Sequence, residues 1–352
     1  LLRTTEEYKD LQGNVVLKRS YIKNGSNVDS VQTYYIYDDF GLLRYVLPPL
    51  AVKKRGTQSY LDPSIQLVKD LCYYYQYDPR KRMIIKQLPG AGQVHLVYDN
   101  RDRLIASQDA NQRVASKWLV TKYDHLNRPV MTAFKYFNPS ESRESLQTFL
   151  NTFQGTMYES RIEGGIGYNL SSLNPKFSLT ETDLLTITYY DSYQISDTLK
   201  FYENDTVRVS NYYNSVTNKH YSEQTRSLIT GTRVKVLNDY EHTAGQFTWL
   251  STTIYYDDKY RPIQKLRDLK SSNSYDREII STLYDFVGKP KKVCTRQIFR
   301  GKVNTVTETY FYDHADRLVQ IKHKLNKGTD QILASMEYND LGQLRRKALH
   351  GQ

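Results

Sequence analysis

Pairs of acidic residues are the first feature of this sequence whose type and spacing could do chemistry. Asp38-Asp39 and Asp257-Asp258 each place two carboxylates side by side, and carboxylate oxygens are ligands that calcium prefers. Calcium loops also carry further oxygen ligands at alternate positions, and neither pair is followed by such a series. The sequence therefore favours a structural role in turns for these carboxylates over a metal site.

Motifs of catalysis and cofactor binding are incomplete elsewhere in the chain. Gly164-Gly165-Ile166-Gly167 lacks the full spacing of a dinucleotide-binding loop and the helix that would follow it. The seven histidines show no metal-ligand spacing, and Cys72 and Cys294 lie in unrelated contexts. The chain has no serine elbow, and nothing in it argues for the distant carboxylate pair of a glycosidase. We therefore predict no catalytic residue, no cofactor and no metal ion.

A short motif that contains the aspartates recurs about nine times and organises the whole sequence. The stretch 284–290 is a clean copy and reads Tyr-Asp-x-x-Gly, then a basic residue, then Leu or Pro. A degenerate copy begins at Tyr190, and a fixed repeat of this kind is typical of an array that grows by adding units to one core. The predicted structural residues of the repeat are Tyr37, Asp38, Gly41, Tyr77, Asp78, Tyr98, Asp99, Tyr123, Asp124, Tyr256, Asp257, Tyr284, Asp285, Gly288, Tyr312, Asp313, Tyr338 and Gly342.

Each copy is predicted to form the corner of a β-hairpin. An aspartate at the first position of a type I turn accepts hydrogen bonds from the backbone ahead of it, and the fourth position often needs a positive φ. Glycine adopts that φ freely, and Asn and Asp tolerate it best among the other residues. Three copies fit poorly, because Lys81 and Tyr260 stand where glycine is expected and residues 191–194 lack both the glycine and the base. The fourth position holds Gly41, Asp102, Asn127, Gly288, Asp316 and Gly342 in the others.

Runs of β-branched and aromatic residues lead into the turns, as in 33–37, 252–256 and 308–312, and these runs are typical of strands. A basic residue follows most turns. From there, a guanidinium reaches the turn aspartate or stacks on a tyrosine ring. We therefore predict an all-β fold of repeated hairpins in which these bases serve the structure in preference to phosphate binding.

The repeat also predicts the organisation of the chain. Residues 1–137 form hairpins, 138–185 form an insertion of a helix and a loop, and 186–352 form hairpins continuous with the first part. The insertion's helix is predicted to begin with Asn138 as N-cap and Pro139 at its first position. A second short helix is predicted after Asp62, preceded by a basic loop over 53–56.

Composition leaves one binding function open. The formal net charge is +11, and the chain has 32 tyrosines, so exposed tyrosines on a basic background could stack on glycans or single-stranded nucleic acid. The chain contains no apolar run approaching the roughly 18 residues of a membrane-spanning helix. A glycan- or nucleic-acid-binding module is therefore the alternative to a purely structural role.

The repeated Tyr-Asp-x-x-Gly-Arg-Leu unit resembles the YD repeat of RHS-family proteins, which include insecticidal toxin complexes and teneurins. The phrases 35–41 with Leu47-Pro48-Pro49, 75–78 with 88–92, and 121–124 with Arg128-Pro129-Val130 look like large RHS proteins of Bacteroidetes-type bacteria. The resemblance covers nearly the whole chain and departs from the pattern at 191–194. It implies β-hairpin strips that spiral into part of a hollow shell, in a fragment that lacks the family's core region and C-terminal domain.

The resemblance also implies a function. We expect a non-catalytic structural segment of a large secreted or bacterial cell-surface protein, whose shell encloses a C-terminal domain, as in polymorphic toxins, or is displayed for adhesion or gliding after type IX secretion. The expected partners are the remainder of the same polypeptide, with secretion machinery or outer-membrane proteins as further candidates. Nucleic acid is not expected as a partner.

Overall fold

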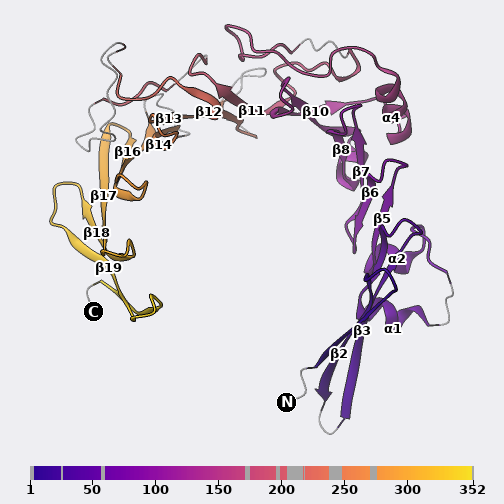
Figure 1. Ribbon diagram of the computed structural model, residues 1–352. Coiled ribbons are helices and arrows are strands. Elements are labelled where there is room, and N and C mark those ends of the chain that lie inside the picture. The colour runs from indigo at the N-terminus through magenta and orange to yellow at the C-terminus, as the bar shows by residue number, and fades with distance from the viewer. Residues whose placement is uncertain are drawn as a thin grey trace. The chain divides into compact units, whose positions relative to one another are not determined.

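The computed structural model describes residues 4–24, 27–56, 60–170, 175–195, 199–203, 217, 219–237, 248–269 and 276–350. By contacts the chain divides into two compact units. Unit 1 comprises Leu1–Asn127, Thr132–Tyr158 and Ser171–Leu179, and unit 2 comprises Arg128–Met131, Glu159–Leu170 and Thr180–Gln352. Figure 1 shows that the described secondary structure is dominated by antiparallel strands.

Unit 1 is a ladder in which each strand pairs with the next one along the chain. Successive strands are antiparallel from β1 to β9. The strands are β1 (Thr5–Lys9), β2 (Val15–Asn24), β3 (Asn27–Tyr37), β4 (Leu43–Leu47), β5 (Tyr73–Tyr77), β6 (Met83–Leu88), β7 (Gly92–Tyr98), β8 (Leu104–Gln108) and β9 (Lys117–Tyr123). β10 (Pro129–Tyr136) pairs with β9 and carries residues of both units.

Unit 2 repeats the same ladder. Each strand again pairs with its successor, antiparallel, from β11 to β20. The strands are β11 (Leu184–Asp191), β12 (Thr225–Lys235), β13 (Trp249–Tyr256), β14 (Pro262–Asp268), β15 (Arg277–Tyr284), β16 (Pro290–Phe299), β17 (Lys302–Tyr312), β18 (Leu318–Leu325), β19 (Gln331–Tyr338) and β20 (Leu344–Leu349). The prediction of an all-β fold of repeated hairpins is confirmed.

The helices differ from the prediction in number and position. The described part of the chain holds four short α-helices and a 3-10 turn at Pro175–Phe177. The four are α1 (Pro49–Arg55), α2 (Gln66–Leu71), α3 (Ala110–Val114) and α4 (Arg143–Thr152). The basic stretch expected as a loop is mostly helix α1, whose Pro49 is tolerated because the first helical N–H has no partner within the helix. No signal was recognised for α3, whose Asp109 and Gln112 form a capping box.

The predicted start of α4 was wrong. Asn138 uses its side chain to accept a bond from the Ser140 N–H, and the helix begins four residues later, with Ser142 accepting from the Ser145 N–H. The sequence also predicts an apolar stripe of Leu146, Phe149, Leu150 and Phe153 at helical spacing, and Leu146 and Leu150 are fully buried. They pack with Val97, Trp118 and Val120 of the strands, so α4 covers one face of unit 1.

Besides the cluster beneath α4, two further apolar clusters lie where a helix or a loop packs on the strands. Leu47, Ala51, Val68 and Cys72 form a cluster beneath α1 and α2. In unit 2, residues 199–202 and Tyr221 cover Tyr255, Leu266 and Ile279. The predicted boundaries at 137/138 and 185/186 stay predictions.

Candidate functional site

The repeated turns are the one constellation that recurs throughout the described strands. At each, the backbone N–H of the turn aspartate donates to the carbonyl four residues on, as from Asp99 to Arg103 at 3.0 Å. The carboxylate Oδ1 accepts two further backbone bonds, from Arg101 at 2.9 Å and Arg103 at 3.0 Å. The aspartate thus closes the turn with its side chain, as the sequence predicted.

The fourth turn position has positive φ in every copy that forms this turn. The values are 74° at Gly41, 60° at Asp102, 64° at Asn127, 93° at Gly288, 63° at Asp316 and 77° at Gly342. The interpretation of two copies as poor fits was wrong, because Lys81 and Tyr260 both adopt a φ of 62° in the same turn. The aspartate bonds outweigh the strain of about 1–2 kcal/mol that a side chain pays in this region.

One copy was missed. Asp10-Leu11-Gln12-Gly13 makes the same turn, with Gly13 at a φ of 88° and bonds to Asp10 Oδ1 from Gln12 and Asn14. Lys9 stands where tyrosine was expected, so a search keyed on Tyr-Asp passes over it. The signal was present in the Asp-x-x-Gly core of the motif.

The tyrosine of most copies contacts the strands or the copy before it. Its hydroxyl donates to the carbonyl of a residue just beyond the preceding turn, as from Tyr98 to Met83 at 2.7 Å and from Tyr123 to Leu104 at 2.8 Å. Burial raises the pKa of both hydroxyls, which keeps them protonated as donors. The same bond is made by Tyr37, Tyr190, Tyr256, Tyr284, Tyr312 and Tyr338.

The basic residue after each turn joins two copies. Arg82 Nε donates to its own Asp78 Oδ2 at 2.8 Å, while its guanidinium lies 4.9 Å from the centre of the Tyr98 ring of the next copy. Equivalent stacks are Arg103 on Tyr123, Arg128 on Tyr190, Arg261 on Tyr284, Lys289 on Tyr312 and Arg317 on Tyr338. We call this pair of contacts, the tyrosine hydroxyl bond and the basic stack, the inter-turn stitch.

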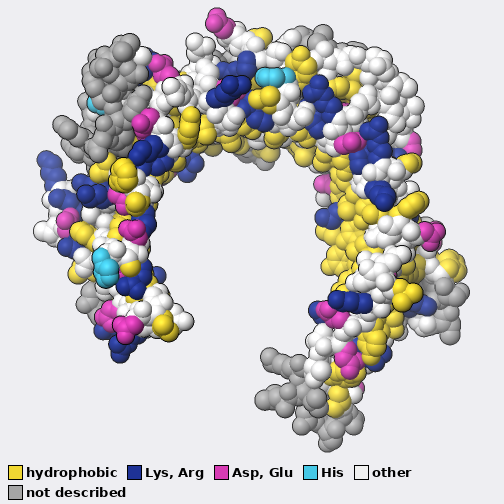
Figure 2. Space-filling model, in the orientation of Figure 1, with side chains coloured by type: hydrophobic (Ala, Val, Ile, Leu, Met, Phe, Trp, Pro, Cys, Tyr) yellow, Lys and Arg dark blue, Asp and Glu magenta, His cyan; other side chains and the backbone are white. Residues whose placement is uncertain are grey.

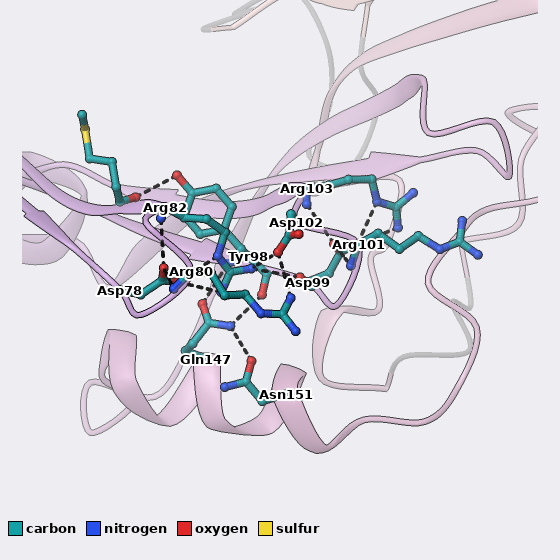
Figure 3. Close-up of polar contacts among 11 residues, drawn as sticks. Asp78, Arg80, Arg82, Tyr98, Asp99, Arg101, Asp102, Arg103, Gln147 and Asn151 are labelled. Carbon is teal, nitrogen blue, oxygen red and sulfur yellow. Dashed lines mark hydrogen bonds and ion pairs between the residues drawn. The ribbon is translucent and has the colours of Figure 1, made fainter. Parts of the chain in front are cut away.

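The stitch also reaches the next turn itself. Arg82 Nη1 donates to Asp102 Oδ1 at 2.8 Å (Figure 3). Likewise, Arg103 Nη1 donates to Asn127 Oδ1 at 3.0 Å. Asp102 and Asn127 are two of the non-glycine residues at positive φ. Their side chains therefore do more than tolerate the backbone conformation, because they accept a bond from the preceding copy's arginine.

The turn at Asp99 is the most enclosed of the series. The Asp99 and Arg103 side chains are 0% and 7% exposed, and Arg103 Nη2 also donates to the Met157 carbonyl. From α4, Gln147 exchanges two bonds with the Tyr98 backbone, accepting from its N–H at 3.0 Å and donating to its carbonyl at 2.8 Å (Figure 3). The insertion is thus anchored on a stitch.

The degenerate copy lacks the turn but retains the ion pair. Asp191 has a φ of 69° and its carboxylate accepts two bonds from Arg128, at 3.0 and 2.6 Å. The Tyr190 ring lies 4.2 Å below that guanidinium. The stitch therefore extends across the residues where the sequence pattern fails.

The other candidate motifs have structural surroundings. The glycine loop at 164–167 closes on itself through the Gly167 N–H to Gly164 carbonyl bond. Beside it, the Arg161 guanidinium lies 5.2 Å and 5.1 Å from the centres of the Tyr168 and Tyr189 rings, which stack on each other. Cys72 and Cys294 are both buried free thiols. Within the described residues, no three His, Cys, Asp or Glu side chains are arranged to hold a metal ion. None of the described helices is long and apolar enough to span a membrane.

The basic excess forms no single large patch on the face that Figure 2 shows. Lys and Arg side chains lie there among acidic, apolar and other polar ones. Most of the arginines named above are held by a turn aspartate and a tyrosine ring. This distribution agrees with the predicted structural use of the bases that follow the turns.

No protein-family model matches this sequence, and no curated protein matches it. Among solved structures, the chain is similar to a crystal structure of TcdB2-TccC3-Cdc42, with 13% identity and a TM-score of 0.58, over 98% of this chain and 13% of that one. It is also similar to a crystal structure of TcdB2-TccC3-TEV, with 14% identity and a TM-score of 0.42, over 97% of this chain and 15% of that one. A third similar structure is the Photorhabdus luminescens Tc holotoxin pore, with 14% identity and a TM-score of 0.31, over 98% of this chain and 22% of that one.

The chain spans well under a quarter of the length of each of these structures. At 13% identity the likeness concerns the fold alone. This chain thus has the all-β fold of repeated hairpins that the sequence predicts, and the fold is similar to that of the TcdB2-TccC3-Cdc42 structure.

Proposed function

We propose that this chain is a non-catalytic scaffold segment of a larger RHS-type protein. The observation that carries the proposal is the inter-turn stitch, which links hairpin to hairpin through the residues that define the sequence motif. Each recurring chemical group of the motif is used in this way: the carboxylate closes its own turn, the base joins it to the next, and the phenol bonds back. The repeat residues therefore build the strip and leave no group of the motif for catalysis.

The wider biological setting belongs to the same proposal. The scaffold is part of a secreted or cell-surface protein of Bacteroidetes type, exported by type IX secretion, and its shell encloses a C-terminal domain or is displayed for adhesion or gliding. The motif resemblance supports this setting, and the fold likeness to the TcdB2-TccC3-Cdc42 structure supports the scaffold role alone.

Two measurements test the scaffold role. The purified chain is expected to show no turnover on panels of glycosides, peptides and nucleic acids, and cryo-electron microscopy of the intact parent protein is expected to show these hairpins as one continuous strip. Turnover that disappears on substitution of a single residue would overturn the proposal. For the location, protease added to intact cells should digest the parent protein, and digestion only after lysis would contradict surface display.

A further inference from the structure

A groove lies on the face of unit 2 across β16, β17 and β18. Its volume is about 740 Å³, and its lining includes Lys292, Arg296, Thr305, Thr307, Lys324 and Lys327. The sequence motif leaves this groove unexplained, since none of its lining residues belongs to a Tyr-Asp turn. We infer that the groove binds an extended, acidic segment of polypeptide.

The strand register aligns the groove with a part of the same sheet face that residues 199–202 cover. Directly paired residues run from Tyr255 to Gln264, Ser281, Cys294, Thr307 and Lys324. Paired residues on adjacent strands point to the same side of a sheet. The side chains of β13 and β14 at one end and those of the groove at the other therefore share one face.

Where residues 199–202 cover this face, side chains of the sheet hydrogen-bond to their backbone. The Leu199 N–H donates to Thr253 Oγ1 at 3.2 Å, and the Leu199 carbonyl accepts from the Tyr255 hydroxyl at 2.9 Å. Gln264 bonds both backbone groups of Tyr202, accepting from its N–H at 2.7 Å and donating to its carbonyl at 3.3 Å. Side chains of the sheet thus hold the main chain of an extended segment, which is how a face can bind peptide without regard to its sequence.

The described part of that cover is in contact with the groove. The Tyr202 ring lies 5.1 Å from the guanidinium carbon of Arg296, which lines the groove. From there, the half-buried hydroxyls of Thr305, Thr307 and Thr309 continue along β17 as the floor. They are donors and acceptors of the kind that Thr253 provides to Leu199.

Charge selects the class of peptide. Lys292 and Arg296 border the threonine row on β16, and Lys324 and Lys327 border it on the other side, with Asp330 as the acidic residue of the lining. No ion pair involves Lys292, Lys324 or Lys327 in the described part of the chain, in contrast to the stitched bases of the turns. Lys292 and Arg296 are about 13 Å apart along the strand at about 3.3 Å per residue. Carboxylates on alternate residues of an extended peptide repeat about every 6.6 Å, so every second one of them meets that spacing.

Aromatic side chains do not line the groove, so base or sugar stacking has no platform there. This separates the occupant proposed here from the glycan or single-stranded nucleic acid that the composition left open. The inference does not depend on the scaffold role, because a peptide site on this face is compatible with any function of the array.

Fluorescence anisotropy with the full chain tests the inference. The probe is a labelled 12-residue peptide in which Glu and Ser alternate, and the reference is the same peptide with Gln for Glu. We expect the acidic peptide to bind at least tenfold more tightly. Lys292→Gln with Lys324→Gln should weaken binding about tenfold or more. Lys291→Gln with Lys302→Gln is the matched control, since both lysines are exposed outside the groove lining, and it should change Kd less than twofold.

The Thr305→Val and Thr307→Val pair separates peptide from other polyanions. It keeps the charge and the side-chain shape but removes two hydroxyls, so it should weaken peptide binding severalfold with an unchanged melting temperature. Equal binding of the Gln peptide, equal loss in both lysine pairs, or tighter binding of heparin or a single-stranded oligonucleotide with no effect of the valine pair would each overturn the inference.

Discussion

The turn at Asp99 and the turn at Asp313 have the same chemistry in different surroundings. In both, the arginine Nε donates to the aspartate Oδ2, at 2.8 and 2.7 Å, and the guanidinium stacks on the next tyrosine. At Asp99 the insertion encloses the pair, whereas the Asp313 and Arg317 side chains are 18% and 29% exposed. The motif thus specifies the ion pair and the stack, and the segment that covers them determines how much free energy is lost when the ion pair is removed.

The largest expected effect is that of Arg103→Met. It leaves the Asp99 carboxylate buried without its cation, which should lower the local free energy of opening by about 3–5 kcal/mol. Arg317→Met, the matched variant at the exposed turn, should cause a much smaller loss because water solvates Asp313. Hydrogen exchange of the β7–β9 and β17–β19 amides measures the two losses, and equal values would show that enclosure is irrelevant.

Two glycine substitutions at the fourth turn position are expected to change the free energy of unfolding in opposite directions. Asn127→Gly relieves a strained φ but removes the acceptor for Arg103, a bond to a charged group worth about 1.5–3 kcal/mol, so a net loss of about 1 kcal/mol is expected. Tyr260→Gly relieves the same φ where the side chain is 54% exposed, so a gain of about 0.5 kcal/mol is expected. Chemical denaturation of both variants measures these two changes in the free energy of unfolding. Two gains would mean that the Asn127 side chain serves only the backbone conformation.

The last prediction, which expects no effect at neutral pH, concerns His95 in unit 1. Burial, helped by the nearby Arg113 charge, lowers the pKa of His95 from 6.5 to about 4. The unfolded chain therefore binds more protons between these values, and this contribution to stability is complete above pH 6.5 and is lost as the pH falls toward 4. His95→Gln should flatten the dependence of the melting temperature on pH across that window. The same slope in both proteins would contradict a buried neutral imidazole.

The sequence predicted the fold class because its signal is local and repeated. An aspartate that caps its own turn, a residue with positive φ and a β-branched run are each determined within about ten residues, and repetition makes the pattern specific. The same locality explains the errors. The start of α4 depended on whether Asn138 or Ser142 would cap it, and Asp10 was missed because the search required a tyrosine.

Hydrogen-bond partners that lie far apart in the sequence could not be predicted from it. Nothing near Asp102 or Asn127 indicates that each accepts a bond from an arginine 20 or more residues earlier. The threonine row of β17 likewise looked like ordinary strand sequence, and only the register placed it beside Lys292 and Lys324.

By itself, the sequence determined that the chain builds repeated hairpins from Tyr-Asp turns, since each turn closes with its own residues. Only the tertiary structure decided which turns are enclosed, which arginine stitches to which tyrosine and where the sheet face stays open. The physical reason is that burial and charge pairing depend on the neighbours that strand register brings together, and register is a property of the assembled ladder.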